Sequence, residues 1–234
     1  MRHKIHMELG EVRLRPARAQ DGAALQPLLD ERMWAGMATP FPASPQEFAR
    51  AYGEKIADPA TVVFSVEYRG ELVGRTCFYD MHVPLRLELG STFYLPAAQG
   101  TTVNPSCKYL LLEYAFTVYE VQRVGLRCDV RNERSARAIA ALGATEEGVA
   151  RAFRRGPHSE PVDTRVFSTG RACAARSVNA WGCRRMAEPG CQEPGRSRWM
   201  RWPASNMAFT ATPAKARSSR YGSVTTKPVM VSTP

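Results

Sequence analysis

More than a quarter of this chain cannot contribute to a hydrophobic core. Residues 171–234 contain no leucine, no isoleucine and only five valines and phenylalanines. A segment with so little apolar surface cannot offset the conformational entropy lost on ordering. We therefore expect one folded domain over residues 12–170, preceded by an extension over 1–11 and followed by a disordered basic tail over 171–234.

The same tail carries almost all of the net charge. The chain has a net charge of +10, and residues 171–234 hold eleven Lys and Arg against two Glu, which is +9. The remainder, with 21 basic and 20 acidic residues, is nearly neutral. Nucleic-acid recognition usually needs a basic face on the folded domain, so it is not expected here. The abrupt change in composition fits either a genuine basic tail or out-of-frame translation after about residue 168.

Nothing in the chain predicts a membrane or secreted protein. No run of roughly 18 apolar residues occurs, and the charged N-terminal stretch is not followed by an apolar segment. The six cysteines contain no CxxC pair and no histidine follows Cys191, so a zinc site is not predicted. We expect a cytoplasmic protein with reduced thiols and no bound metal.

Periodicity and turn residues predict an α+β domain. Apolar alternation marks the strands, and Ser44 followed by Pro45 and Glu47 marks one helix start. An inner glycine, Gly90, predicts a bulge or a close backbone approach in the third long strand. The expected strands are 11–15, 61–68, 71–80, 86–95, 124–130, 144–153 and 161–168, and the expected helices are 24–34, 45–57, 104–119 and 135–143.

Two strand-to-helix connections contain candidate binding groups. The first, residues 95–108, has small side chains before a helix that includes Lys108. Exposed backbone N–H groups at such a helix start favour an anion such as a pyrophosphate. In the second, Asn132 precedes a helix and Ser135 lies on its first turn. Asn132 could be a helix cap, a ligand contact or both.

A longer motif extends from this second connection. Residues 132–151 follow the pattern N-x-x-S-x-x-A-I-x-x-L-G-A-x-x-E-G-V-x-R. With the strands before and after it, this motif resembles the GNAT N-acetyltransferase superfamily, in its RimJ/RimL-type branch, over residues 12–168. The resemblance implies a central mixed, mostly antiparallel sheet flanked by helices. It also implies acetyl-CoA as co-substrate and a primary amine as acceptor.

The resemblance further assigns cofactor contacts. The stretch Gln99-Gly-Thr-Thr-Val-Asn104 stands where the family usually has Q/R-x-x-G-x-G/A, and both of those glycines are replaced. Asn132 corresponds to a residue beside the pantetheine arm, and Ser135 to a hydroxyl that protonates the departing thiolate. The pyrophosphate loop would comprise Gln99, Gly100, Thr101, Thr102, Val103, Asn104 and Lys108.

The candidate general base is Glu88. It lies in Leu87-Glu88-Leu89-Gly90, which resembles an E-I-G stretch of the branch on the strand facing the acceptor. The alternative is an exposed carboxylate at a sheet edge. Because an ordinary carboxylate is a weak base at neutral pH, the role needs a raised pKa or an intervening water. Backbone N–H groups of Leu89, Gly90 and the residues up to Thr92 would bind the thioester oxygen.

These features predict an N-acetyltransferase that uses direct attack in a ternary complex. The acceptor would be a peptide or protein N-terminus or a small amine, and a homodimer is compatible with this interpretation. Two alternatives stay open at this point. One is a CoA-binding or regulatory protein without turnover, and the other is nucleic-acid binding through the tail.

Overall fold

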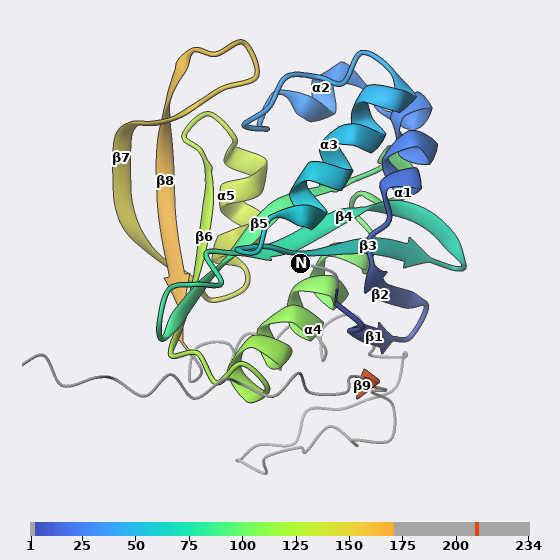
Figure 1. Ribbon diagram of the computed structural model, residues 1–234. Coiled ribbons are helices and arrows are strands. Elements are labelled where there is room, and N and C mark those ends of the chain that lie inside the picture. Colours follow the sequence, from blue (N-terminus) through green and yellow to red (C-terminus); the bar gives the residue numbers. More distant parts are fainter. Residues whose placement is uncertain (1–2, 171–208, 211–234) are drawn as a thin grey trace, which may run out of the picture.

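A computed structural model of the chain describes residues 3–170 and 209–210. These residues form one sheet in the order β7-β8-β6-β5-β4-β3-β2-β1-β9 (Figure 1). Only β5 and β6 pair in parallel, and every other described pair is antiparallel. The mixed, mostly antiparallel sheet is therefore confirmed. The strands are β1 His6–Leu9, β2 Val12–Pro16, β3 Val62–Tyr68, β4 Glu71–Tyr79, β5 Arg86–Tyr94, β6 Arg123–Asp129, β7 Thr145–Arg155, β8 Pro161–Thr169 and β9 Phe209–Thr210.

Helices cover both faces of this sheet. In Figure 1, α1–α3 lie above β3–β5, and α4 lies below them. Within the described residues, no helix is long and apolar enough to cross a membrane. The helices are α1 Ala19–Leu25, α2 Glu31–Trp34, α3 Pro45–Ala57, α4 Val103–Thr117 and α5 Glu133–Ala140, with 3-10 turns η1 Gln26–Leu28 and η2 Pro96–Ala98.

The helix predicted over 24–34 is wrong as one element. The structure has the end of α1, then η1, then α2. Pro27 lacks a backbone N–H, so it cannot continue the helical hydrogen-bond ladder. Asp30 then begins a new helix, because its side chain accepts a hydrogen bond of 2.7 Å from the Arg32 backbone N–H.

The expected domain limits differ from the structure at the N-terminal end. The segment 1–11, expected to precede the domain, contains β1, which pairs with β2, and Met7 on β1 is fully buried. Most of the tail, expected to be disordered, lies outside the described residues. Two of its residues, Phe209–Thr210, form β9 against β1.

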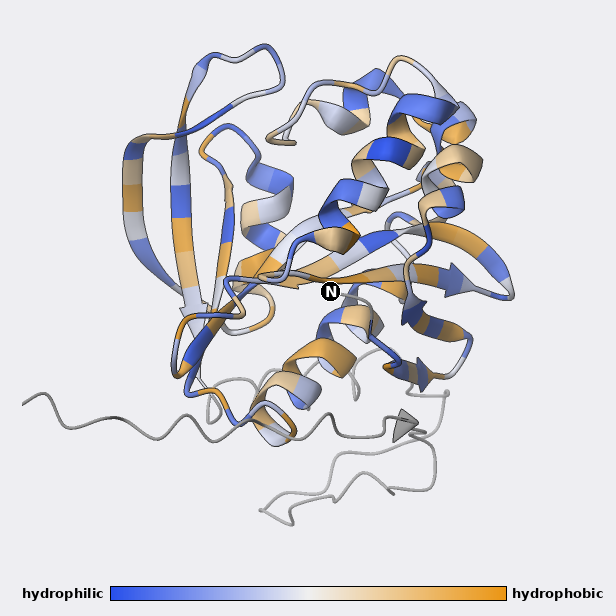
Figure 2. Cartoon of the chain, viewed as in Figure 1, coloured by the Kyte–Doolittle hydropathy of each residue, from blue (hydrophilic) through white to orange (hydrophobic). Residues whose placement is uncertain are grey.

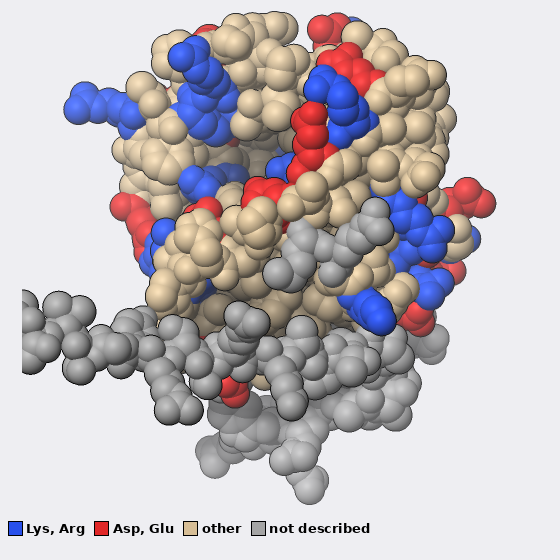
Figure 3. Space-filling view, in the orientation of Figure 1, with Lys and Arg blue, Asp and Glu red and all other residues tan. Residues whose placement is uncertain are grey.

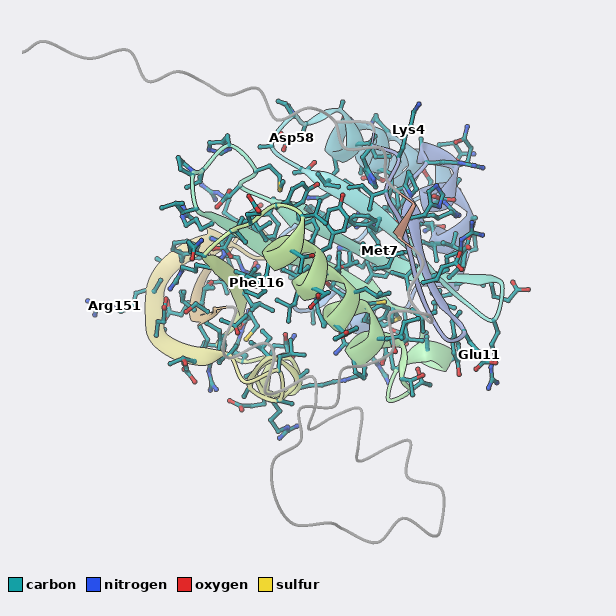
Figure 4. All side chains as sticks on the ribbon, turned by 90° about the horizontal axis from the view of Figure 1, so that it is seen from below. Lys4, Met7, Glu11, Asp58, Phe116 and Arg151 are labelled. Carbon is teal, nitrogen blue, oxygen red and sulfur yellow. The ribbon has the colours of Figure 1, made fainter. Side chains whose placement is uncertain are left out.

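The main core lies between the sheet and α4. Leu110, Leu111 and Ala115 on this helix are fully buried. Figure 4 shows α4 crossing the lower face of the sheet, with Phe116 on it. Apolar residues are prominent on α4 and the central strands in Figure 2. A second, aromatic cluster lies on the opposite face and includes Trp34.

The parallel pair β5–β6 opens soon after it begins. Its ladder joins Arg86 to Arg123, Leu87 to Val124 and Glu88 to Gly125, and then stops, although both strands continue. The carboxyl ends of the two strands therefore separate, and α4 and α5 begin beyond them. In Figure 3, the molecule is hollowed in this region, between the side formed by β6–β8 and the side formed by α2 and α3.

Candidate active site

The connection between β5 and α4 presents unpaired backbone donors. Gly100 has a positive φ of +74°, and a Cβ there would meet nothing within 4 Å. The Thr101 hydroxyl donates to the Ala98 carbonyl at 2.7 Å and accepts from the Val103 N–H at 3.2 Å. The described residues supply no acceptor for the N–H groups of Gly100, Thr101, Thr102 and Asn104. Unpaired N–H groups beside a helix start can bind an anionic group such as a diphosphate.

Gln99 links the two helix starts. Its side-chain nitrogen donates to the Tyr94 carbonyl at 2.8 Å, and its oxygen accepts from Arg134 on α5 at 2.7 Å. The loop before α4 is therefore tied to the first turn of α5. Both ends of the Gln99 side-chain amide are thus hydrogen-bonded within the protein. The unpaired backbone N–H groups belong to the residues that follow it in the loop.

Asn132 is the N-cap of α5, as predicted. Its Oδ1 accepts a hydrogen bond of 2.9 Å from the Ser135 backbone N–H. Its Nδ2 lies against Gly36 in the loop between α2 and α3, where an added Cβ would come within 2.5 Å of it. The cap therefore uses one end of the amide and directs the other toward that loop.

The Ser135 hydroxyl lies beside the Cys128 thiol near the end of β6. Burial raises the pKa of this thiol, and the hydrogen bond to Ser135 opposes that shift. Ser135, on the first turn of α5, thus contacts the end of the separated strand β6, and these two elements border the opening.

Glu88 is a buried group at the last rung of the β5–β6 ladder, not a carboxylate on a sheet edge. The residue is 8% exposed, and its carboxylate oxygens lie 3.2 Å from Arg127 Nε and 3.6 Å from an Arg86 nitrogen. Burial raises the pKa of Glu88, and the nearby Arg127 guanidinium partly opposes the rise. Its Oε2 forms no hydrogen bond with the described residues despite the ion pair. The carboxylate is therefore buried and still able to accept a proton.

The predicted irregularity at Gly90 is present. Arg75 pairs with Phe93 but Cys77 pairs with Gly90, so β5 has one residue more than β4 at this point. Ser91 within this bulge has a positive φ of +50°. The Tyr79 hydroxyl approaches Gly90 so closely that an added Cβ would lie 3.0 Å from it. The bulge is therefore observed, and the group that approaches Gly90 closely is a side chain, not a neighbouring backbone.

Two aromatic residues near Glu88 were not identified from the sequence. The Arg127 guanidinium lies 5.4 Å from the Tyr79 ring centre and 5.0 Å from that of Phe153. Burial raises the pKa of Tyr79 to about 12, so its hydroxyl is neutral at physiological pH. Tyr79 lies on β4, Arg127 on β6 and Phe153 on β7, three strands of the sheet that do not pair directly with one another. No local spacing in the sequence indicates that arrangement.

Arg154, also not identified from the sequence, connects β7 to the loop after α2. Its guanidinium donates to the Met37 carbonyl at 3.2 Å and the Gly36 carbonyl at 3.3 Å, and it lies 3.7 Å from Asp129. A bulge in β7 directs it there, since the register shifts between Ala150 and Arg154. The loop next to Asn132 is therefore held across the opening.

The structure does not place Lys108 at the expected anion site. Its Nζ donates to the Thr92 hydroxyl on β5 at 3.0 Å, and the residue is 6% exposed. The side chain points into the core between α4 and the sheet. Spacing along the helix could not distinguish this direction from one toward the helix start.

Comparisons with known proteins identify a matching family and similar folds. The family model for the acetyltransferase (GNAT) domain matches residues 11–145, and a search of curated proteins found no match. A GCN5-related N-acetyltransferase from Brucella melitensis is similar with a TM-score of 0.69 at 22% identity, over 76% of this chain and 84% of its own.

Two further solved structures share the fold. A probable acetyltransferase of the GNAT family from Chromobacterium violaceum ATCC 12472 has a TM-score of 0.66 at 26% identity, over 70% of this chain and 85% of its own. RimJ of Mycobacterium smegmatis, in complex with CoA-disulfide, has a TM-score of 0.65 at 18% identity, over 76% and 93%. The chain belongs to the GNAT acetyltransferase family, which its sequence motif had indicated.

Proposed function

We propose that this protein transfers the acetyl group of acetyl-CoA to a primary amine by direct attack in a ternary complex. One observation carries the proposal. The β5–β6 ladder ends at Glu88 and Gly125, so a buried carboxylate lies at the closed end of an opening that both helix starts face. A thioester and an amine can meet between these ends.

The residues that would hold acetyl-CoA are those with unused donors. The N–H groups of residues 100–102 and Asn104 suit the diphosphate, and the Nδ2 of Asn132 suits the pantetheine arm. That RimJ, bound to CoA-disulfide, has the same fold supports this placement. When bound, acetyl-CoA supplies an activated acyl group, and the protein orients it.

Three groups would move protons or polarise the substrate. The backbone N–H groups of Leu89–Thr92 at the β5 bulge would bind the thioester oxygen. The amine nitrogen forms a bond to the carbonyl carbon, and the carbon–sulfur bond breaks. Glu88 takes one proton from the amine, directly or through water, and the Ser135 hydroxyl gives one to the sulfur. Ser135 then regains a proton from solvent, which also receives the proton from Glu88.

The proposed acceptor is any of several primary amines. A peptide or protein N-terminus and a small amine both present the required nitrogen, and the nearly neutral domain favours neither. We place the reaction in the cytoplasm. The free, buried thiols of Cys77, Cys107 and Cys128 support that location.

The test is release of the CoA thiol by the full-length protein with a panel of peptides and small amines. We expect turnover with at least one acceptor and a higher Tm with acetyl-CoA, because a ligand that binds only the folded state stabilises it. A higher Tm without thiol release across the panel would favour a CoA-binding protein. An unchanged Tm and no release would refute both.

A further inference from the structure

Among the residues that the structure describes, two buried cations have no carboxylate partner. Arg75 on β4 is 4% exposed and Lys108 on α4 is 6% exposed. Within the part of the chain that the structure describes, neither forms an ion pair. Burying a charge without a counter-charge is costly. Such groups are therefore retained for a reason other than the stability of the core.

Both cations bind the same bulge, from opposite faces of the sheet. The Arg75 guanidinium lies 3.1 Å from the Ser91 hydroxyl and 3.4 Å from the Ser91 carbonyl. Lys108 Nζ lies 3.0 Å from the Thr92 hydroxyl, which is 2.8 Å from that of Thr76. The two consecutive residues of the bulge are thus each held by a buried cation.

The surroundings leave each cation little freedom. On the α3 face, the Arg75 guanidinium lies 4.7 Å from the Tyr52 ring centre and 5.3 Å from that of Phe93. On the α4 face, Lys108 projects from a helix whose neighbouring residues, Cys107 and Leu111, are fully buried. Both contacts to the bulge are therefore fixed by packing.

The bulge would not hold its shape unaided. Ser91 is a non-glycine residue at a φ of +50°, which costs free energy unless the surrounding structure compensates. In the proposed function, this same segment supplies the N–H groups that bind the thioester oxygen. Preorganised donors near a developing negative charge are effective because they need no rearrangement during the reaction.

We infer that Arg75 and Lys108 are positioning residues that hold the β5 bulge from both faces of the sheet and place positive charge beside the reacting thioester oxygen. This inference rests on the proposed function. It assigns to the acetyl transfer two residues that do not touch the substrate.

The ionisation of Lys108 supports this role. Burial lowers its pKa to about 8, so the charge is present at neutral pH and is lost as the pH rises above that value. The titratable groups that face it are Cys107 on its own helix and Cys77 on β4. Burial raises the pKa of Cys107 to about 12, so this thiol stays neutral through that range.

The test compares Lys108→Met and Thr92→Val with wild type in the full-length protein. We expect both variants to lower kcat roughly 10- to 100-fold and to change the KM for acetyl-CoA less than about threefold. Wild-type kcat should fall as the pH rises through about 8, and Lys108→Met should lack this fall. Thr92→Val retains the lysine and nearly the same shape, so it covers the case in which Lys108→Met fails to fold.

Cys107→Ala is the matched control, because it alters a buried neighbour on the same helix that does not contact the bulge. It should leave kcat and the alkaline fall unchanged. The inference would be overturned if both test variants kept the wild-type kcat, or if Cys107→Ala lowered kcat as much as they do. It would also be overturned if the test variants changed only the KM for acetyl-CoA. Wild-type thiol release is measured separately, so failure of the proposed function is distinguished from failure of this inference.

Discussion

The carboxylate of Glu88 on β5 lies directly against the backbone of Gly125 on β6. The two residues are paired in the last rung of the parallel ladder, and an added Cβ on Gly125 would overlap the Glu88 carboxylate. Only glycine leaves room there. The burial that raises the pKa of Glu88 therefore depends on the absence of a side chain on the neighbouring strand.

Gly125→Ala should displace the Glu88 carboxylate. We expect kcat to fall roughly 100-fold, because a small misplacement of a catalytic group can cost that much. The control is Gly53→Ala on α3, where a Cβ meets nothing within 4 Å. This control should retain activity and gain up to about 1 kcal/mol of stability from helix propensity. Equal activity of the two variants would contradict the assigned position of Glu88.

Glu88→Gln should remove the acid limb of the pH profile. Burial raises the folded-state pKa of Glu88 above its ordinary 4.5, so wild-type activity should be lost as the pH falls through that raised pKa. The variant cannot take the proton, and we expect kcat to drop about 10²- to 10⁴-fold. Steady-state rates between pH 5 and 8 test this. An unchanged acid limb in the variant would assign the proton transfer to another group.

Ser135→Ala and Asn132→Ala should differ in what they impair. The serine variant should lower kcat with little change in acetyl-CoA affinity, since only proton delivery is lost. The asparagine variant should weaken affinity and also lower the free energy of unfolding by about 1 kcal/mol, because the α5 cap is lost. Chemical denaturation and steady-state kinetics separate the two. If Ser135→Ala changed only the KM for acetyl-CoA, Ser135 would be a binding residue.

Local patterns in the sequence were sufficient to predict most of the helices and strands. The cap at Ser44 is observed with its hydrogen bond to the Glu47 N–H, and the cap at Asn132 is observed as well. The predicted bulge at Gly90 also appears. These features depend on residues close together in the chain. By contrast, β1 is only four residues long, which is too short for alternation to distinguish it from an extension.

The candidate site was less predictable because its parts are brought together by tertiary packing. Lys108 was expected at the anion site, but a lysine on the second turn can point either to the helix start or into the core. Arg127 on β6 and Phe153 in the irregular part of β7 are far apart in sequence and meet only in the folded sheet. Sequence spacing contains no signal for such contacts.

Arg154→Ala should release the loop that spans the opening. Its guanidinium donates to Gly36 and Met37, and the loop lies next to Asn132. We expect a several-fold higher KM for the acceptor with a smaller change in kcat. Arg155→Ala is the control, because this neighbour donates to the Ser159 carbonyl on the same hairpin instead. If both variants raise the KM for the acceptor equally, acceptor binding depends on the positive charge of the hairpin and not on the contact between Arg154 and the loop.

Lys108→Met should make the protein more stable at neutral pH. The folded-state pKa is lowered from 10.5 to about 8, so the folded protein bears the cost of a buried charge at any pH below 8. This cost is on the order of 3 kcal/mol and is relieved as the pH rises from 8 to 10.5, where only the unfolded chain remains protonated. Urea unfolding at pH 7 and pH 10 should therefore show a stability gain that shrinks with pH.

Cys107→Ala should instead lose stability at both pH values, through a lost packing contact. A variant that is more stable and also slower would mean that Lys108 is retained for the reaction at the expense of stability. A Lys108→Met protein that is less stable at pH 7 would assign the lysine a structural role.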